Sequence, residues 1–375
     1  HVRLPAPSFS VRVHQNSPME FLYRACEVSR LGYGVPAFYN DEVIILALVS
    51  RGVALKDARD YSIIGCVEPQ AGHRTEGWHD AAFFNIAKVL EITLNNGRCK
   101  GKQLGPKTGE LEELDSMEKI LAAYQKQMEY FVRHLAKADN AVDYAHMERA
   151  PLPFMSAMVD DCIKRGKSCQ EGGAIYNFTG PQAFGIADAG DSLYAIQKNV
   201  FEDKRITLKE LRDALEANFG YSDAAAPICT PSISEATLDE AQIYEAVKKI
   251  LSSTGSIDIA TLESHLKQGA GTSCGCKSQS DPSKYATIHN ILKNTDSFGN
   301  DLEEVDEFAY RCGKIYCNEV DKYMNPRGGQ FQAGIYPVSA NVLFGKDVAA
   351  LPDGRLATEP LADGVSPRQG NDVNG

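Results

Sequence analysis

The chain has 375 residues, of which 43% are hydrophobic and 24% charged, and its formal net charge is −11. This composition is typical of a globular protein, and the acidic balance argues against a nucleic-acid-binding surface. No apolar run reaches about 18 residues and the N-terminus lacks a signal-peptide pattern, so we expect no membrane span. Ten cysteines without zinc-finger spacing predict neither a disulfide scaffold nor a metal centre, and they favour a reducing cytoplasm.

The N-terminal part of the chain alternates strand and helix patterns. Residues 8–14 alternate apolar and polar side chains, which predicts a strand. Asn40 and Asp41 are candidate caps of the second predicted helix, because Asn and Asp favour that position. A repeated strand–helix order is typical of α/β proteins. The helices predicted in this stretch cover residues 19–28, 42–51 and 55–61.

The next stretch, Gly65-Cys66-Val67-Glu68-Pro69, follows the apolar run at residues 61–64. An apolar run that ends in Gly and is followed by Pro predicts a buried strand that breaks into a tight loop. Alternate residues of an extended segment point the same way, so Cys66 and Glu68 are expected to face one cavity. A negative charge beside a thiol disfavours the thiolate. The pair therefore suits chemistry in which sulfur is a neutral thiol or thiyl radical and the carboxylate moves a proton.

Helical spacing of apolar side chains recurs after this loop. Asp80 is a candidate cap of the first of these helices. Gly166 and Pro326 are helix breakers that end two others. The predicted helices cover residues 80–94, 117–134 with a continuation towards 149, 152–165, a stretch that begins at Asp191 or Ser192, 208–218 and 301–324, and a strand is predicted at 338–344.

Two stretches differ in composition from the rest. Residues 171–190 are rich in glycine but contain neither G-x-G-x-x-G nor a P-loop, which favours close backbone packing inside a barrel over a phosphate loop. Residues 222–285 contain linker-like segments around short helices and predict a surface insertion. Within it, Cys274 and Cys276, with Cys229 upstream, are a metal-site alternative, which is disfavoured because a C-x-C pair lacks the usual ligand spacing.

Several motifs resemble those of glycyl radical enzymes. The stretch at residues 65–69 is similar to the cysteine loop of that family. The string Glu-Gly-Trp-His-Asp-Ala-Ala-Phe-Phe-Asn at residues 76–85 resembles the branch that contains the coenzyme-B12-independent glycerol and propanediol dehydratases. The chain is therefore identified as the central portion of a glycyl radical enzyme. Further similar segments occur at residues 149–154, 172–178, 325–329 and 360–367.

The resemblance implies the fold. It is an α/β fold, a partial glycyl-radical-enzyme barrel of two half-sheets of parallel strands, mutually antiparallel, with helices outside. Residues 1–221 would form the central barrel portion with the cysteine loop, residues 222–285 the insertion, and residues 286–375 the barrel continuation. Family members continue to an Arg-Val-x-Gly-Tyr type motif whose glycine carries the stored radical. That motif does not occur in this sequence, so we expect the fragment alone to be inactive.

The resemblance also implies roles for particular side chains. Cys66 corresponds to the thiyl radical that abstracts hydrogen from a substrate carbon, and Glu68 to the general base that takes a proton from the hydroxyl on that carbon. Asp80 corresponds to a substrate-binding aspartate, with helix capping as a compatible structural role. Tyr336 is a candidate substrate contact, with core packing as the alternative. His79 is a candidate proton donor to the leaving hydroxyl, although a structural imidazole is favoured.

The function implied for the full-length protein is radical-based dehydration of glycerol or 1,2-propanediol to an aldehyde. No bound cofactor or metal is expected, and a radical S-adenosylmethionine activating enzyme would install the glycyl radical. We expect a homodimer in the cytoplasm, with a bacterial microcompartment as the alternative location, and no nucleic-acid or membrane partner. The alternatives are cleavage of a hydroxyalkanesulfonate or another C–O, C–N or C–S bond, and a truncated inactive scaffold. The neutral Gln332 favours a neutral diol over a sulfonate.

Overall fold

The computed structural model describes residues 9–31, 35–221, 281–336 and 340–372. The chain divides into two compact units, each assembled from three separate stretches. The predicted insertion and its three cysteines lie outside the described residues, apart from residues 281–285. Unit 1 comprises residues 1–79, 146–179 and 324–330, and unit 2 comprises residues 80–145, 180–323 and 331–375.

The N-terminal part of unit 1 follows the predicted order of strands and helices. The first two strands, β1 and β2, are parallel, with Val11 opposite Phe38. Asn40 caps helix α2, since its side chain accepts a hydrogen bond from Glu42 N at 2.9 Å. The elements are β1 (Ser10–Val13), α1 (Met19–Ser29), β2 (Ala37–Asn40), α2 (Asp41–Ser50), α3 (Leu55–Arg59), β3 (Tyr61–Ile64) and β4 (Glu68–Ala71).

An ion pair fastens this part of unit 1 together. Arg12 of β1 lies 2.9 Å from the carboxylate of Asp41, and its guanidinium covers the ring of Tyr61 at 3.9 Å from the centroid. The Tyr61 hydroxyl donates to the same carboxylate at 2.7 Å. Hydrogen bonding to Arg12 lowers the pKa of Asp41. The small core behind them contains Tyr39, Leu48, Val53, Ala58, Tyr61, Ala71 and Phe178.

The long strands β5 (Thr75–Asn85) and β8 (Tyr176–Phe184) pair with each other in a sheet of their own. The helix predicted from residue 80 is therefore wrong over its first six positions. Helix α4 begins at Ile86, and its cap is Asn85, whose side chain accepts from Lys88 N at 2.9 Å. Asp80 lies inside β5 and caps no helix. Local spacing could not detect this strand because its partner lies about a hundred residues away in the chain.

Several other helix boundaries differ from prediction. The helix predicted at 152–165 is two short helices, because Asp161 adopts a left-handed conformation with φ of 74°, and Gly166 ends the second as expected. Helix α8 begins at Ile186, five residues before the expected start. The remaining helices are α4 (Ile86–Leu94), α5 (Met117–Arg149), α6 (Pro153–Met158), α7 (Cys162–Arg165), α8 (Ile186–Ile196), α9 (Leu208–Glu216), α12 (Ala286–Lys293), α13 (Glu303–Val320) and α14 (Asn341–Gly345).

The strand predicted at residues 338–344 is also wrong over the residues that the structure describes. Residues 341–345 form α14, and residues 337–339 lie outside the described part. The chain after α14 forms loops, as expected for its Pro, Gly and Asp content. These loops are fastened by the fully buried Arg355, which donates to the carbonyls of Gly345 at 2.7 Å and Ala349 at 2.9 Å.

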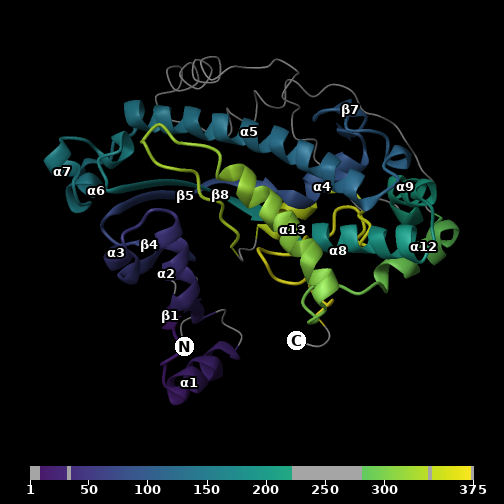
Figure 1. The fold of residues 1–375 in the computed structure, drawn as a ribbon, viewed down its shortest axis with the longest axis horizontal. Coiled ribbons are helices and arrows are strands. Elements are labelled where there is room, and N and C mark those ends of the chain that lie inside the picture. The colour runs from purple at the N-terminus through teal and green to yellow at the C-terminus, as the bar shows by residue number, and fades with distance from the viewer. Residues whose placement is uncertain (1–8, 32–34, 222–280, 337–339, 373–375) are drawn as a thin grey trace. The chain divides into compact units, whose positions relative to one another are not determined.

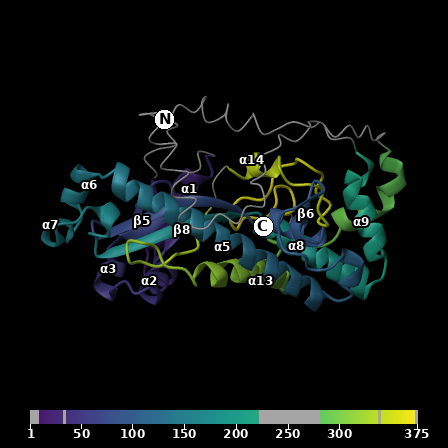
Figure 2. The ribbon, with the colours of Figure 1, turned by 90° about the horizontal axis from the view of Figure 1, so that it is seen from above.

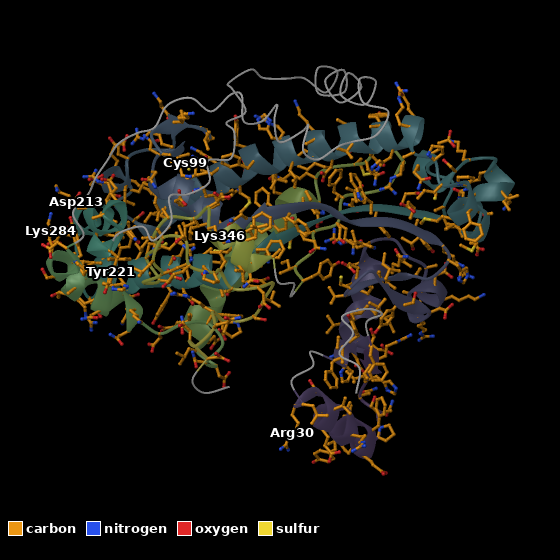
Figure 3. All side chains as sticks on the ribbon, turned by 180° about the vertical axis from the view of Figure 1, so that it is seen from behind. Arg30, Cys99, Asp213, Tyr221, Lys284 and Lys346 are labelled. Atoms are coloured by element: carbon orange, nitrogen blue, oxygen red, sulfur yellow. The ribbon has the colours of Figure 1, made fainter. Side chains whose placement is uncertain are left out.

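Most of the hydrophobic core lies in unit 2. Figure 2 shows α5 as one unbroken helix, and its buried face contributes to this core together with α4, α8, α9 and α13. Asp213 of α9 and Lys284, which precedes α12, are close to each other in Figure 3, and their opposite charges attract. No helix in the described ranges is long and apolar enough to cross a membrane. Fully buried core side chains include Leu90, Ile120, Tyr124, Met128, Leu193, Leu211, Phe219 and Tyr316.

Helices α8 and α13 lie side by side in Figure 1 and approach each other closely at Gly190. A Cβ atom at Gly190 would lie 2.6 Å from Ala309 Cα and 2.7 Å from Ala309 N. Since these are backbone atoms, the helices would have to move apart to admit a side chain. The described strands form small two-stranded sheets, including the short antiparallel pair β6 (Arg98–Cys99) and β7 (Lys102–Gln103), and no closed barrel.

We predict that Gly190→Ala lowers the free energy of unfolding by about 1–3 kcal/mol, because it overpacks the crossing of α8 and α13. Gly313→Ala is the matched control. It lies in α13, and its Cβ would be no closer than 3.7 Å to any neighbour, so it is expected to be neutral or to stabilise by up to about 1 kcal/mol. Urea unfolding of both variants measures the difference. Equal stability of the two would contradict the close approach.

Candidate active site

Cys66 lies at the tip of a hairpin between β3 and β4. The strands are antiparallel with Ile64 opposite Glu68, so only residues 65–67 form the turn. The Cys66 side chain is exposed. Gly65 begins the turn with φ of +57°, and a Cβ there would lie 2.7 Å from Glu68 Oε2. The turn therefore needs glycine at this position both for its backbone conformation and for the room that the carboxylate occupies.

Glu68 is 2% exposed, and its carboxylate folds back over the turn. Glu68 Oε2 accepts hydrogen bonds from the backbone N–H groups of Cys66 and Val67, each at 2.9 Å. The structure thus brings the predicted pair together, although by a different geometry. Residues 65–67 form a turn rather than an extended segment, so strand alternation does not align the two side chains. The buried carboxylate is therefore fixed to the backbone of Cys66, the residue that carries the exposed thiol.

His79 and Gln70 form a buried polar pair in the same unit. His79 Nε2 lies 3.3 Å from Gln70 Oε1, a hydrogen bond when Nε2 carries the proton. Burial lowers the pKa of His79 to about 4. The negative charge of Glu68 opposes this shift, and the positive charge of Arg327 adds slightly to it. His79 is therefore neutral near pH 7, so its imidazole is not already protonated as a general acid would be. Its Nδ1 atom has no hydrogen-bond partner among the described residues.

Arg327 is 6% exposed and holds the strands of unit 1 together. Its guanidinium donates to the carbonyl of Glu76 at 3.0 Å and to the carbonyl of Phe178 at 2.7 Å. It also donates to Thr179 Oγ1 at 3.0 Å. Arg327 therefore joins β5, β8 and the turn at residues 324–330.

Asp80 and Tyr336, the predicted substrate contacts, lie in unit 2. The exposed Asp80 carboxylate on β5 accepts a hydrogen bond from the side-chain amide of Gln182 on β8. Gln182 is 1% exposed, and sequence reasoning did not single it out. A polar side chain within a buried strand was the available signal, because a buried amide needs a hydrogen-bond partner.

A third extended segment, residues 331–336, lies beside β8. Gly334 N donates to Pro181 O and Ala183 N donates to Gly334 O, both at 2.9 Å, in a parallel bridge centred on Gln182 and Gly334. Bridged residues present their side chains to the same face of a sheet. Phe331, Ala333 and Ile335 pack in the core, so alternation directs Gln332, Gly334 and Tyr336 to the opposite face.

The predicted site residues therefore fall into two pairs. Cys66 and Glu68 are brought together in unit 1 by the hairpin turn. In unit 2, Gln182 bonds to Asp80 and is bridged to Gly334, two residues before Tyr336.

Comparison with known proteins identifies the family. The pyruvate formate lyase-like family model matches residues 1–345, and this chain belongs to that family, the glycyl radical enzymes. It is 48% identical to the glycerol-bound B12-independent glycerol dehydratase from Clostridium butyricum, with a TM-score of 0.80 over 100% of this chain. It is 46% identical to the structure described for 1,2-propanediol dehydration in Roseburia inulinivorans, with a TM-score of 0.80 over 99% of this chain. These matches confirm the predicted family and its α/β fold.

A third relative, the (2S)-3-sulfopropanediol dehydratase of Klebsiella oxytoca, is 33% identical over 98% of this chain. The chain spans only part of each of these proteins. It covers 39% of the Clostridium chain, 40% of the Roseburia chain and 37% of the Klebsiella protein. Thus the chain corresponds to about two fifths of their length.

We predict that His79 makes the stability of the protein depend on pH below about 6.5. The unfolded imidazole binds a proton below about pH 6.5, whereas folded His79 does so only near pH 4. The unfolded state therefore gains protons first, and the free energy of unfolding falls as the pH drops between these values. Between pH 7 and pH 5 the loss that His79 causes is about 2 kcal/mol.

Urea unfolding of the wild type and of His79→Gln at pH 7 and pH 5 measures this loss. The variant is expected to lose about 2 kcal/mol less than the wild type over this interval. Between pH 7 and pH 8 the two proteins should change in parallel, which is the internal control. The same pH dependence in both proteins below pH 6.5 would be evidence against a buried neutral His79.

Proposed function

We propose that the full-length protein is a glycyl radical dehydratase that converts glycerol or 1,2-propanediol to an aldehyde. The observation that carries this proposal is the hairpin in which the buried Glu68 carboxylate bonds to the backbone of Cys66, the residue with the exposed thiol. Sequence identities of 48% and 46% to the two diol-dehydrating relatives support the substrate class.

In the proposed reaction the glycyl radical comes from a loop outside this chain, after the action of a radical S-adenosylmethionine activating enzyme. Cys66, as a thiyl radical, takes a hydrogen atom from the hydroxyl-bearing carbon C1 of the diol. Glu68 takes the proton of the C1 hydroxyl, which favours breaking of the neighbouring C2–O bond. The departing hydroxide, together with this proton, is released as water.

The product radical at C2 then regains a hydrogen atom from the Cys66 thiol, and the aldehyde is formed. The sequence is neutral in electrons, because the hydrogen atom taken in the first step is returned in the last. The fixed position of the carboxylate in the turn suits this role, since a general base must hold one position relative to the proton it receives.

Asp80 and Tyr336 are the proposed substrate contacts. A carboxylate accepts hydrogen bonds from hydroxyl groups and repels a sulfonate. Asp80, the amide of Gln182 and the neutral Gln332 therefore favour a neutral diol. The second candidate is a sulfonate-bearing substrate, which the 33% identity to the sulfopropanediol dehydratase favours.

The proposal includes the other expectations for the full-length protein. No resident cofactor or metal takes part, and the protein acts as a homodimer in the cytoplasm or inside a bacterial microcompartment. Its macromolecular partner is the activating enzyme.

Anaerobic activation of the full-length protein, followed by product analysis with glycerol, 1,2-propanediol, isethionate and choline, tests the proposal. Aldehyde should form from the diols. Cys66→Ala is expected to abolish it, because no thiyl radical can form. Glu68→Gln should lower kcat by about 10²–10⁴-fold, the usual loss when a general base is removed. Cys26→Ala, which removes another exposed thiol, is the matched control and should retain activity.

Product analysis together with electron paramagnetic resonance, which detects the glycyl radical, distinguishes the alternative substrates from the inactive scaffold. Sulfite from isethionate or trimethylamine from choline, without aldehyde from the diols, would replace the substrate and keep the radical mechanism. Absence of a glycyl radical signal after activation of the full-length protein would support the inactive scaffold. A radical signal without product from any of the four compounds would refute the proposed substrate class.

A further inference from the structure

Gln182 has an unusual position for a polar side chain. It lies in the stretch of β8 from Asn177 to Phe184 in which every residue is buried. Its own side chain is 1% exposed. Burial of an amide N–H donor is unfavourable unless it is hydrogen-bonded, so the Gln182 side-chain NH2 group needs an acceptor.

The Asp80 carboxylate on the neighbouring strand is that acceptor. Gln182 Nε2 donates to Asp80 Oδ1, and Asp80 is an exposed residue. An exposed carboxylate samples several rotamers, whereas a hydrogen bond from a buried group restricts it to one. Hydrogen bonds to an ionised acceptor are also stronger than neutral ones. The rigid strand therefore fixes the direction of the exposed carboxylate.

The position of Gln182 is itself fixed by its neighbours in the sheet. The backbone groups on either side of it, Pro181 O and Ala183 N, both bond to Gly334 at 2.9 Å. A Cβ atom at Gly334 would lie 2.5 Å from the ring of Tyr336, so the ring lies against the glycine backbone. Gln182 thus bonds to Asp80 through its side chain and is bridged through its backbone to Gly334, against which the Tyr336 ring lies.

We propose that Gln182 is a positioning residue that orients the Asp80 carboxylate to accept hydrogen bonds from the hydroxyl groups of a neutral vicinal diol. This inference rests on the proposed function. An amide suits the task better than a cation, because it directs the carboxylate without cancelling its charge. The charge that remains attracts hydroxyl donors and disfavours anionic substrates, so Gln182 contributes to substrate selection through Asp80.

The test compares Gln182→Leu, Gln182→Glu and Asp80→Asn in the activated full-length protein, with 1,2-propanediol as substrate. Gln182→Leu removes the donor at similar volume. It should raise KM at least about tenfold, the effect of losing one charge-assisted hydrogen bond, while kcat changes much less. In the Asp80→Asn background the same substitution should raise KM no further, because its effect passes through Asp80. Glycyl radical content and thermal stability show that each variant is folded and activated.

Gln182→Glu adds a readout that a merely structural role would not change. At low pH its carboxyl group can keep a proton and donate it to Asp80, as the amide does. As the pH rises the two carboxylates repel each other, so the ratio of its KM to that of the wild type should rise across roughly pH 6–9. The same ratio for Gln182→Leu should stay constant with pH.

The two proposals fail in different ways. Diol turnover by the wild type with an unchanged KM in Gln182→Leu, or additive effects of the two substitutions, would overturn the role of Gln182 and leave the dehydratase function in place. A wild-type protein that carries the radical but neither binds nor converts the diol would overturn the proposed function and, with it, the role of Gln182. Binding of unactivated protein to the diol, measured by calorimetry, separates these outcomes.

Discussion

The site depends most directly on the two hydrogen bonds that the Glu68 carboxylate accepts from the turn containing Cys66. A buried carboxylate would be unfavourable without donors, and here the turn itself supplies them. The same contacts hold the turn in its shape and fix the carboxylate to the backbone of Cys66. Gly65 makes this possible, because any side chain at that position would occupy the space of the carboxylate. One short hairpin therefore combines an accessible sulfur atom with a fixed, buried carboxylate.

The sequence predicted those parts of the fold that depend on neighbours within a few residues. The Asn40 cap, the end of a helix at Gly166 and the course of the long helix α5 all follow from local patterns. The helix predicted from Asp80 was wrong because residues 80–85 pair with β8, and apolar spacing over so few residues fits a strand as well as a helix. The early start of α8 at Ile186 and the helix α14 were missed for the same reason, since packing of distant segments outweighs local preference.

In the candidate site, too, features that depend on neighbouring residues were predicted, and those that depend on distant residues were not. Cys66 and Glu68 are two residues apart, so the motif alone was enough to predict that they lie close together. Gln182 was missed because its partner, Asp80, lies 102 residues away, and a glutamine within a glycine-rich stretch carries no local sign of that partner. Likewise, the tautomer and neutral state of His79 depend on burial beside Gln70, which no spacing reveals. Sequence patterns thus identify candidate site residues more readily than the distant side chains that contact them.

The interleaved composition of the two units has a consequence for synthesis. Unit 1 draws on residues 1–79, 146–179 and 324–330. Arg327, in the last of these stretches, donates to carbonyl groups in β5 and β8 that are translated long before it. During translation these carbonyl groups are made before Arg327, so they lack this donor until it has been added. The hairpin with Cys66 therefore belongs to a unit that is still incomplete at that stage. Unit 1 can therefore be completed only after residue 330 has been made, and the two units cannot form one after the other along the chain.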